Sequence, residues 1–95
     1  MVIGTCRMRL SADWANSLKD KRMIVKSIID KTKRKFNVSI AETELQDAHR
    51  EIVIGFACVT NEAAHADSTI QHVLNFIENS TDAVVCDVRT EILHI

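Results

Sequence analysis

The sequence contains no proline, no tyrosine and only two glycines, Gly4 and Gly55, each inside an apolar segment. Phosphate-cradling loops need glycines at fixed spacing between a strand and a helix, so a P-loop and a dinucleotide fingerprint are absent, which also argues against an acylphosphatase-like activity. No segment approaches the roughly 18 consecutive apolar residues of a membrane span. The N-terminal segment alternates and lacks the basic-then-apolar layout of a signal peptide, so we expect a cytoplasmic protein that has no membrane partner.

Residues with catalytic or metal-binding chemistry are few and scattered. Cys6, Cys58 and Cys86 are odd in number and far apart, so we expect reduced, buried, metal-free thiols; a cluster on three neighbouring strands is the alternative. His65 and His72 lie seven residues apart, about 10.5 Å along a helix, which is too far to share one metal ion. We therefore expect no catalytic residues, no metal and no cofactor.

Hydrophobic periodicity divides the chain into six elements. Alternating apolar side chains predict a strand from Val2 to Leu10, and apolar character on both faces predicts a central strand over residues 51–60. A helical period predicts helices over residues 18–36, opened by a capping-box-like SLKD, and between Asn61 and Asn79. A short strand is predicted over residues 38–42 and a final strand over residues 83–93.

The order βαββαβ is most simply an α+β ferredoxin-like sandwich formed by residues 1–95 as a single domain. Right-handed crossovers and short connections favour a four-stranded antiparallel sheet in the order 4-1-3-2. Both helices are then expected on one face of the sheet.

Four short motifs stand out along the chain: SLKDKR at residues 17–22, FNVSIAE at 36–42, the Gln46–Asp47 pair and TNEAAH at 60–65. Together they resemble the YlxP-like family, small bacterial proteins classed as a domain of unknown function, over essentially the whole chain. The resemblance implies the ferredoxin-like fold and a cytoplasmic bacterial protein. The family's genes often sit beside those for ribosome-binding factor A and initiation factor two, which implies a link to translation. It implies no established activity and no agreed catalytic residues.

One predicted loop departs from the family pattern. Family members often carry Trp soon after the Gln46–Asp47 pair, whereas Ala48 and His49 follow in this chain. Asp47, His49 and Arg50 imitate an acid–base set, but without a pocket or a nucleophile we interpret the loop as a polar connection.

Positive charge is concentrated in the first predicted helix. Residues 19–36 hold eight of the twelve Lys and Arg residues and two acids, a net charge of +6, whereas residues 37–95 hold two basic and ten acidic residues. Four cations fall on one flank, about 60–120° from the buried direction: Lys19, Arg22, Lys26 and Lys33. This stripe is about 21 Å long and could follow several phosphates. The alternative is a solvated helix face that offsets acidic neighbours.

Two further side chains near this helix carry expectations of their own. Lys21, about 40° from the buried direction, is expected to snorkel along the core edge and to contribute less to phosphate binding. Trp14, the only tryptophan, is expected to pack over the edge of the core.

The uncovered face of the central strand suggests a second surface. It presents Val53, Gly55, Ala57 and Val59, with Arg7 beside them on the first strand. A small apolar patch ringed by charge suits a partner, including a second copy of the chain; the alternative is an ordinary exposed sheet. Base stacking on this face is not expected, because the first strand has no aromatic residue and the only one on the central strand, Phe56, shares the face of Ile52 and Ile54.

The charge stripe, together with the link to translation that the family resemblance implies, predicts a non-enzymatic protein that contacts RNA or a ribosomal particle through phosphates bound along the first helix. The rival hypothesis is a homodimeric or protein-binding module that works through the open sheet face. A small enzyme is the third class considered.

Overall fold

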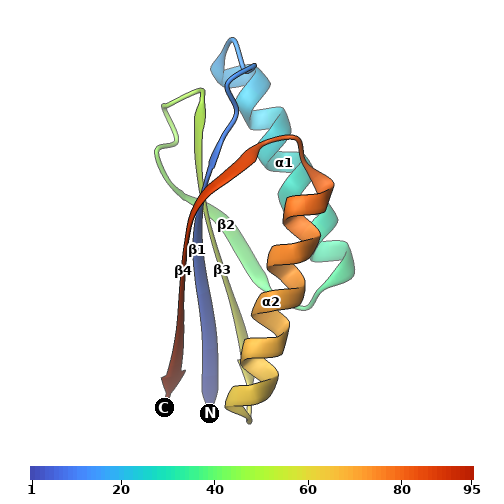
Figure 1. Cartoon of the computed structure of the whole chain (residues 1–95), viewed down its shortest axis with the longest axis vertical. Helices are drawn as coiled ribbons and strands as arrows, with labels where there is room; N and C mark the ends of the chain where they lie inside the picture. Colours follow the sequence, from blue (N-terminus) through green and yellow to red (C-terminus); the bar gives the residue numbers. More distant parts are fainter.

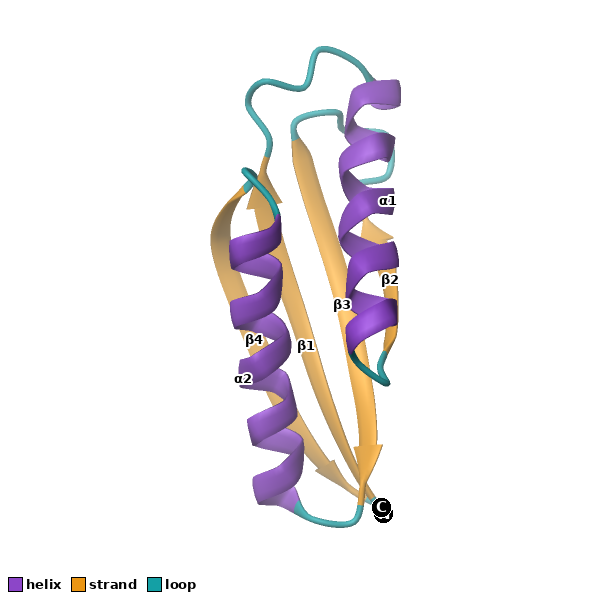
Figure 2. Cartoon of the chain, turned by 90° about the vertical axis from the view of Figure 1, so that its right-hand side faces the viewer, coloured by secondary structure: helices purple, strands orange, loops and turns teal.

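The computed structural model describes residues 1–95 and has the predicted order βαββαβ. Both helices lie on one side of a four-stranded sheet and the other side is open (Figures 1 and 2). The expected bounds of the elements are correct to within two residues. The elements are β1 (Val2–Ser11), α1 (Leu18–Lys35), β2 (Ser39–Glu44), β3 (Glu51–Thr60), α2 (Ala63–Ser80) and β4 (Val84–His94).

The strands form one antiparallel sheet in the order β2-β3-β1-β4, which is the predicted order read from the opposite edge. The central pair, β1 and β3, has an unbroken register from Val2 opposite Thr60 to Ser11 opposite Glu51. Both edge strands shift register near one level of the sheet, β4 beside Arg9 and β2 before Glu44. Such bulges bend a strand and redirect its side chains, so simple alternation fails on both edges at this end.

Local hydrogen bonds explain where α1 begins. The Ser17 hydroxyl accepts a hydrogen bond from the backbone N–H of Asp20 at 3.1 Å, and the Asp20 carboxylate accepts one from the N–H of Asn16 at 3.0 Å. This is the predicted capping box with its return bond shifted by one residue. The helix ends at Phe36, whose backbone is extended and whose ring packs edge-on against Phe76 of α2, with 5.5 Å between ring centroids.

The core fills the space between the helices and the covered face of the sheet. α2 packs tightly on β1 at Gly4, where a Cβ would lie 3.0 Å from Ile70 Cδ1 and 3.2 Å from Ala66 Cβ. An alanine at this position would therefore require Ile70 and Ala66 of α2 to shift. Fully buried apolar residues come from both layers: Met8, Leu10, Ile52, Ile54, Ile70, Val73 and Ile77.

The thiols were only partly predicted. Cys6 and Cys58 are buried, as expected, but Cys86 is exposed. The reason is the register shift in β4: Asp87 pairs with Arg9 and Val85 with Leu10, so Cys86 is the extra residue between them. All three thiols are free, and no group of three or more His, Cys, Asp or Glu side chains is placed to hold a metal ion. Neither helix is both long and apolar enough to cross a membrane.

Candidate nucleic-acid interface

The four stripe cations, Lys19, Arg22, Lys26 and Lys33, are all exposed on α1. Only Lys26 has an ion pair, with its Nζ 3.1 Å from Asp30 one turn along the helix. Lys19, Arg22 and Lys33 have no carboxylate oxygen within 4.0 Å. Three of the four predicted site residues therefore carry charge that nothing within the chain neutralises by direct pairing.

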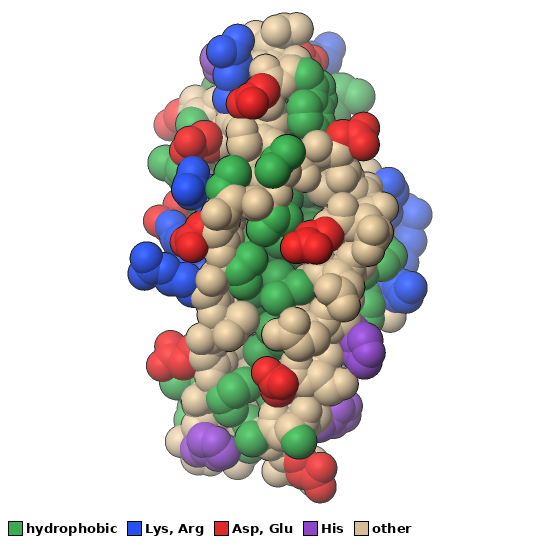
Figure 3. Space-filling view, in the orientation of Figure 1, with side chains coloured by type: hydrophobic (Ala, Val, Ile, Leu, Met, Phe, Trp, Pro, Cys, Tyr) green, Lys and Arg blue, Asp and Glu red, His purple; other side chains and the backbone are tan.

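The stripe lies on the flank of α1 that has no neighbouring helix. Ile24 and Ile28, on the opposite flank, line a hollow together with residues at the end of α2. They are about 60–100° from Val25 in one rotational sense, while the stripe is about 60–120° from it in the other. In the space-filling view a group of Lys and Arg atoms lies at the right-hand edge beside the later part of α1, whereas basic and acidic atoms alternate along the sheet side (Figure 3).

The cations near the end of α1 have a structural explanation that those near its start lack. Lys33, Arg34 and Lys35 lie in the last turn, where positive charge is stabilised by the helix dipole. Lys35 also sits over two rings, with its Nζ 4.9 Å from the centroid of Phe76 and 5.9 Å from that of Phe36. A lysine at position 33 is therefore partly explained by its stabilising effect on α1, without any ligand.

Lys19 and Arg22 occupy the opposite end of α1. The dipole disfavours cations there, and neither side chain has an acidic partner to offset that effect. These two residues are the part of the stripe that folding alone does not explain.

The prediction for Lys21 was wrong. Its side chain has no exposed surface, so the ammonium does not reach water along the core edge. The Nζ donates hydrogen bonds to the carbonyl oxygens of Leu45, at 2.6 Å, and Gln46, at 3.3 Å, and lies 2.7 Å from Glu42 Oε2. The last contact is an ion pair whose angle does not suit a hydrogen bond, so this buried carboxylate oxygen has no hydrogen-bond donor. Lys21 therefore belongs to the core and not to the binding surface.

These contacts give the loop between β2 and β3 a structural role. Leu45 has a positive φ of 57°, which is uncommon for a non-glycine residue, and its carbonyl is held by Lys21. At the other end of the loop, the Arg50 carbonyl accepts a hydrogen bond from Ala12 N–H at 2.8 Å, and Arg50 Nε donates to the Ala15 carbonyl at 3.4 Å. The β2–β3 loop is thus bound at one end to Lys21 of α1 and at the other end to residues 12–15, the segment before α1. No interaction within the chain links Asp47 and His49 as an acid–base pair.

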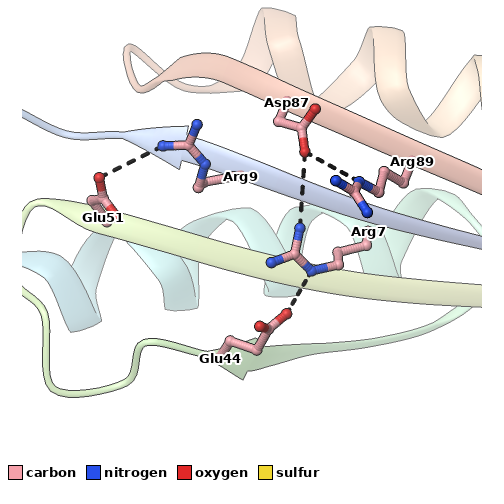
Figure 4. A network of polar contacts seen from close by, with 6 residues as sticks. All are labelled: Arg7, Arg9, Glu44, Glu51, Asp87 and Arg89. Carbon is pink, nitrogen blue, oxygen red and sulfur yellow. Dashed lines mark hydrogen bonds and ion pairs between the residues drawn. The ribbon is translucent and has the colours of Figure 1, made fainter.

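The open sheet face carries a network of ion pairs centred on Arg7 (Figure 4). Arg7 Nε donates a hydrogen bond to Glu44 on β2, and its Nη1 lies 3.9 Å from Asp87 on β4. Arg89 is 3.6 Å from the same Asp87 oxygen. The hydrogen bond from Arg7 lowers the pKa of Glu44, and the same bond raises the pKa of Arg7. The guanidinium group of Arg7 is thus already paired with carboxylates, Glu44 on β2 and Asp87 on β4.

The apolar patch predicted on the open face was wrong at two of its positions, Val53 and Gly55. Val53 has no exposed surface, because the register places it between the long side chains of Arg9 on β1 and Glu44 on β2. Over Gly55 the space is filled by Thr43, whose Cγ2 lies 2.9 Å from where a Cβ would be. The β2 bulge directs Thr43 there. Neither Val53 nor Gly55 can meet a partner directly.

At the other end of the open face, near the chain termini, the predicted residue Val59 belongs to an apolar row whose other two members, Ile3 and Leu93, were not predicted. Val59 is 69% exposed and lies opposite Ile3 of β1, which lies opposite Leu93 of β4. Ala57, two residues before Val59 on the same face of β3, is half-buried. Of the expected interface residues, only Ala57 and Val59 therefore remain accessible and apolar. Alternation along β1 and β4 would have identified Ile3 and Leu93.

Comparisons with known proteins bear on the family and the fold. The sequence model of a family described as "Protein of unknown function (DUF503)" matches residues 3–90. The "Uncharacterized protein YlxP" of Bacillus subtilis (strain 168) is 36% identical over 77 residues, which cover 81% of this chain and 84% of that protein.

Two solved structures of designed proteins are similar in fold. The de novo designed protein LFR1 1, described as having a ferredoxin fold, has a TM-score of 0.57 and 20% identity, covering 96% of this chain and 87% of the design. The de novo designed protein Foldit4 has a TM-score of 0.53 and 14% identity, covering 99% of this chain and 97% of the design. At this identity the likeness shows the ferredoxin-like fold alone.

Proposed function

Because the chain belongs to the DUF503 family, which is described only as of unknown function, we propose a function from its surfaces: a cytoplasmic, non-enzymatic protein that binds RNA or a ribosomal particle through phosphates along α1. The observation that carries the proposal is the position of Lys19 and Arg22. They lie exposed and unpaired at the end of α1 where the helix dipole opposes positive charge. A bound phosphate supplies the missing negative charge.

The geometry of the stripe suits a polyanion better than a single ion. Its cations are spread along one flank of an 18-residue helix and do not converge on one point. Each phosphate contact releases condensed counterions, so binding grows with the number of cations engaged and weakens steeply with salt. Arg22 offers two parallel hydrogen bonds to one phosphate, whereas each lysine acts as a point charge. Contacts of this kind position the protein without reading sequence.

The open sheet face supports this assignment by its composition. Phe56 is buried on the covered side, and no aromatic residue lies on the open side. Stacking of bases across the sheet, the mode of RNA-recognition motifs, is therefore unavailable. The arginines of that face are engaged with Glu44, Glu51 and Asp87, which leaves α1 as the surface with uncompensated cations.

The test compares two triple charge reversals that change net charge equally. One reverses Lys19, Arg22 and Lys33, the unpaired residues of the stripe; the control reverses Lys31, Arg34 and Lys35, which have no ion pairs either and lie off the stripe. Binding to total cellular RNA and to ribosomal particles is measured by co-sedimentation over a range of salt. We expect the stripe variant to lose binding and to fold normally, since exposed charges contribute little stability.

The control decides what a loss means. Equal loss in both triple variants would show that net charge alone matters and that the stripe has no special role. If the wild-type protein binds neither RNA nor ribosomal particles at low salt, the proposal is wrong and α1 is a solvated face.

A second candidate function is favoured by the row of Val59, Ile3 and Leu93. Val59 and Leu93 are exposed and Ile3 between them is half-buried, and accessible apolar side chains that adjoin one another across three strands are a feature of interaction surfaces. The partner proposed for this surface is a second copy of the chain, packed sheet to sheet. The two functions use opposite faces of the molecule and do not exclude each other.

A further inference from the structure

An open hollow lies between the segment that precedes α1, α1 itself and the C-terminal end of α2. Its volume is about 320 Å³. Its apolar lining includes Trp14, Met23 and Ile24, and its polar lining includes Ser27 of α1 and Thr81 and Asp82 after α2. Trp14 is 48% exposed and Met23 65% exposed, so two large apolar side chains meet solvent at one place. The expectation that Trp14 packs over the edge of the core was wrong, because about half of its surface is exposed and it does not belong to the core cluster.

The segment that carries Trp14 is held firmly. Its neighbours Ala12 and Ala15 are both fully buried, and the N–H of Ala15 donates to the carbonyl of Ala12 at 3.0 Å. Arg50 fixes the same segment from the β2–β3 loop, by accepting from Ala12 N–H and donating to the Ala15 carbonyl. An exposed aromatic ring on a fixed turn loses little freedom when a ligand packs on it.

The hollow lies mainly on the flank of α1 opposite the cation stripe, and its rim residue Met23 lies between the two. Met23 follows Lys19 by four residues and precedes Lys26 by three, and these spacings make side chains neighbours on a helix. A strand whose phosphates lie on Lys19 and Lys26 therefore runs beside Met23, and a base turned away from the stripe reaches the hollow over this side chain. Asp82, on the far wall, repels phosphate and keeps the backbone out of it.

We propose that the hollow receives an unpaired RNA base, stacked on Trp14, from a strand whose phosphates are bound by the stripe; this inference rests on the proposed function. Every base has a π-face, so stacking on one aromatic ring is compatible with weak sequence preference. The carboxylate of Asp82 accepts hydrogen bonds and donates none. It favours the bases with an exocyclic amino group, adenine, cytosine and guanine, over uracil.

Trp14 reports on its own site, because the chain has one tryptophan and no tyrosine. The experiment titrates the full-length protein with single-stranded oligoadenylate, with the same length of oligouridylate, with an oligomer of abasic ribose phosphates and with duplex RNA. Tryptophan fluorescence measures contact at the hollow, and the anisotropy of labelled RNA measures total binding. We expect oligoadenylate to quench the fluorescence saturably, oligouridylate to quench less, and the abasic and duplex ligands to bind without quenching.

Variants separate stacking from charge. Trp14→Ala should weaken oligoadenylate binding about fivefold or more, the loss of one stacked base, while its affinity for the abasic oligomer stays unchanged. Trp14→Phe should retain most of the affinity, which guards against a variant that merely misfolds. Normal affinity of Trp14→Ala for oligoadenylate, with salt-sensitive binding intact, would overturn the base site and leave the proposed function standing. Absence of RNA binding in every assay would overturn both.

Discussion

The ammonium group of Lys21 lies 2.7 Å from the carboxylate of Glu42, although no part of the lysine side chain is exposed. A buried lysine is tolerated only when it is paired and hydrogen-bonded, and the carbonyl oxygens of Leu45 and Gln46 supply the remaining contacts. This arrangement ties α1 to both β2 and the loop that follows it. Because Arg50 at the far end of that loop holds Ala12 and Ala15, the position of Trp14 depends indirectly on Lys21.

Replacing Lys21 by methionine should destabilise the fold by about 3–5 kcal/mol, because it leaves the largely buried Glu42 carboxylate without its cation. Urea unfolding at neutral pH measures the change. The double variant Lys21→Met with Glu42→Leu removes both charges and should recover a large part of the loss. A single variant as stable as the wild type would show that Glu42 is adequately solvated.

The fold was predictable because each element carries its own pattern. The ten residues of β3 are apolar on both faces, and the structure places that strand in the sheet interior between β2 and β1. Helical periodicity found the buried direction of α1 to within about 30°, since Val25, Ile28 and Thr32 are buried.

The candidate site was predictable only in part, because its errors come from contacts between distant segments. Helical angles put Lys21 near the core but could not reveal that Glu42 of β2 pairs with its ammonium group there. Strict alternation put Val53 on an open face, but bulges at the sheet edges and neighbouring long side chains bury it. The exposure of Trp14 depends on a loop contact with Arg50, for which no local pattern exists.

The hydrogen bond between Arg7 and Glu44 should be visible in acid titration. It lowers the pKa of Glu44, so this carboxylate stays charged to lower pH than an ordinary glutamate. The stability it contributes is present above the ordinary glutamate pKa and is lost as pH falls through the lowered value. Replacing Arg7 by glutamine should raise the pKa of Glu44 toward its usual range, measured by NMR of the side-chain carboxyl carbon. The exposed Glu62 is a matched reference, and an equal shift at both sites would contradict a local cause.

Self-association through the open sheet face has a separate test. Sedimentation equilibrium at high micromolar concentration should detect a dimer in the wild-type protein, and Val59→Glu should give a folded monomer, because it puts a charge on the most exposed member of the apolar row. Gln71→Glu, on the exposed side of α2, changes net charge equally and should not alter the mass. A wild-type protein that remains monomeric at this concentration would remove the second candidate function.

The three thiols should react very differently, because the bulge in β4 exposes one of them. At pH 8 a disulfide-exchange reagent should titrate one thiol, Cys86, in the native protein and three after denaturation; Cys86→Ala should show none in the native state. Rapid reaction of a second thiol in the native protein would contradict the burial of Cys6 and Cys58.

Burial also makes Cys6 a source of alkaline instability. It raises the pKa of this thiol from 9.0 to about 11, so between these values the unfolded chain releases a proton that the native protein retains. The associated stability is complete below pH 9 and is lost as pH rises through 11, by roughly 2–3 kcal/mol for a shift of this size. Urea unfolding of the wild type and of Cys6→Ala at pH 8 and pH 11 isolates this effect from the other groups that titrate in the same range. The wild type should lose more stability than the variant over this interval, and equal losses would show that the Cys6 thiol ionises as readily in the native protein as in the unfolded chain.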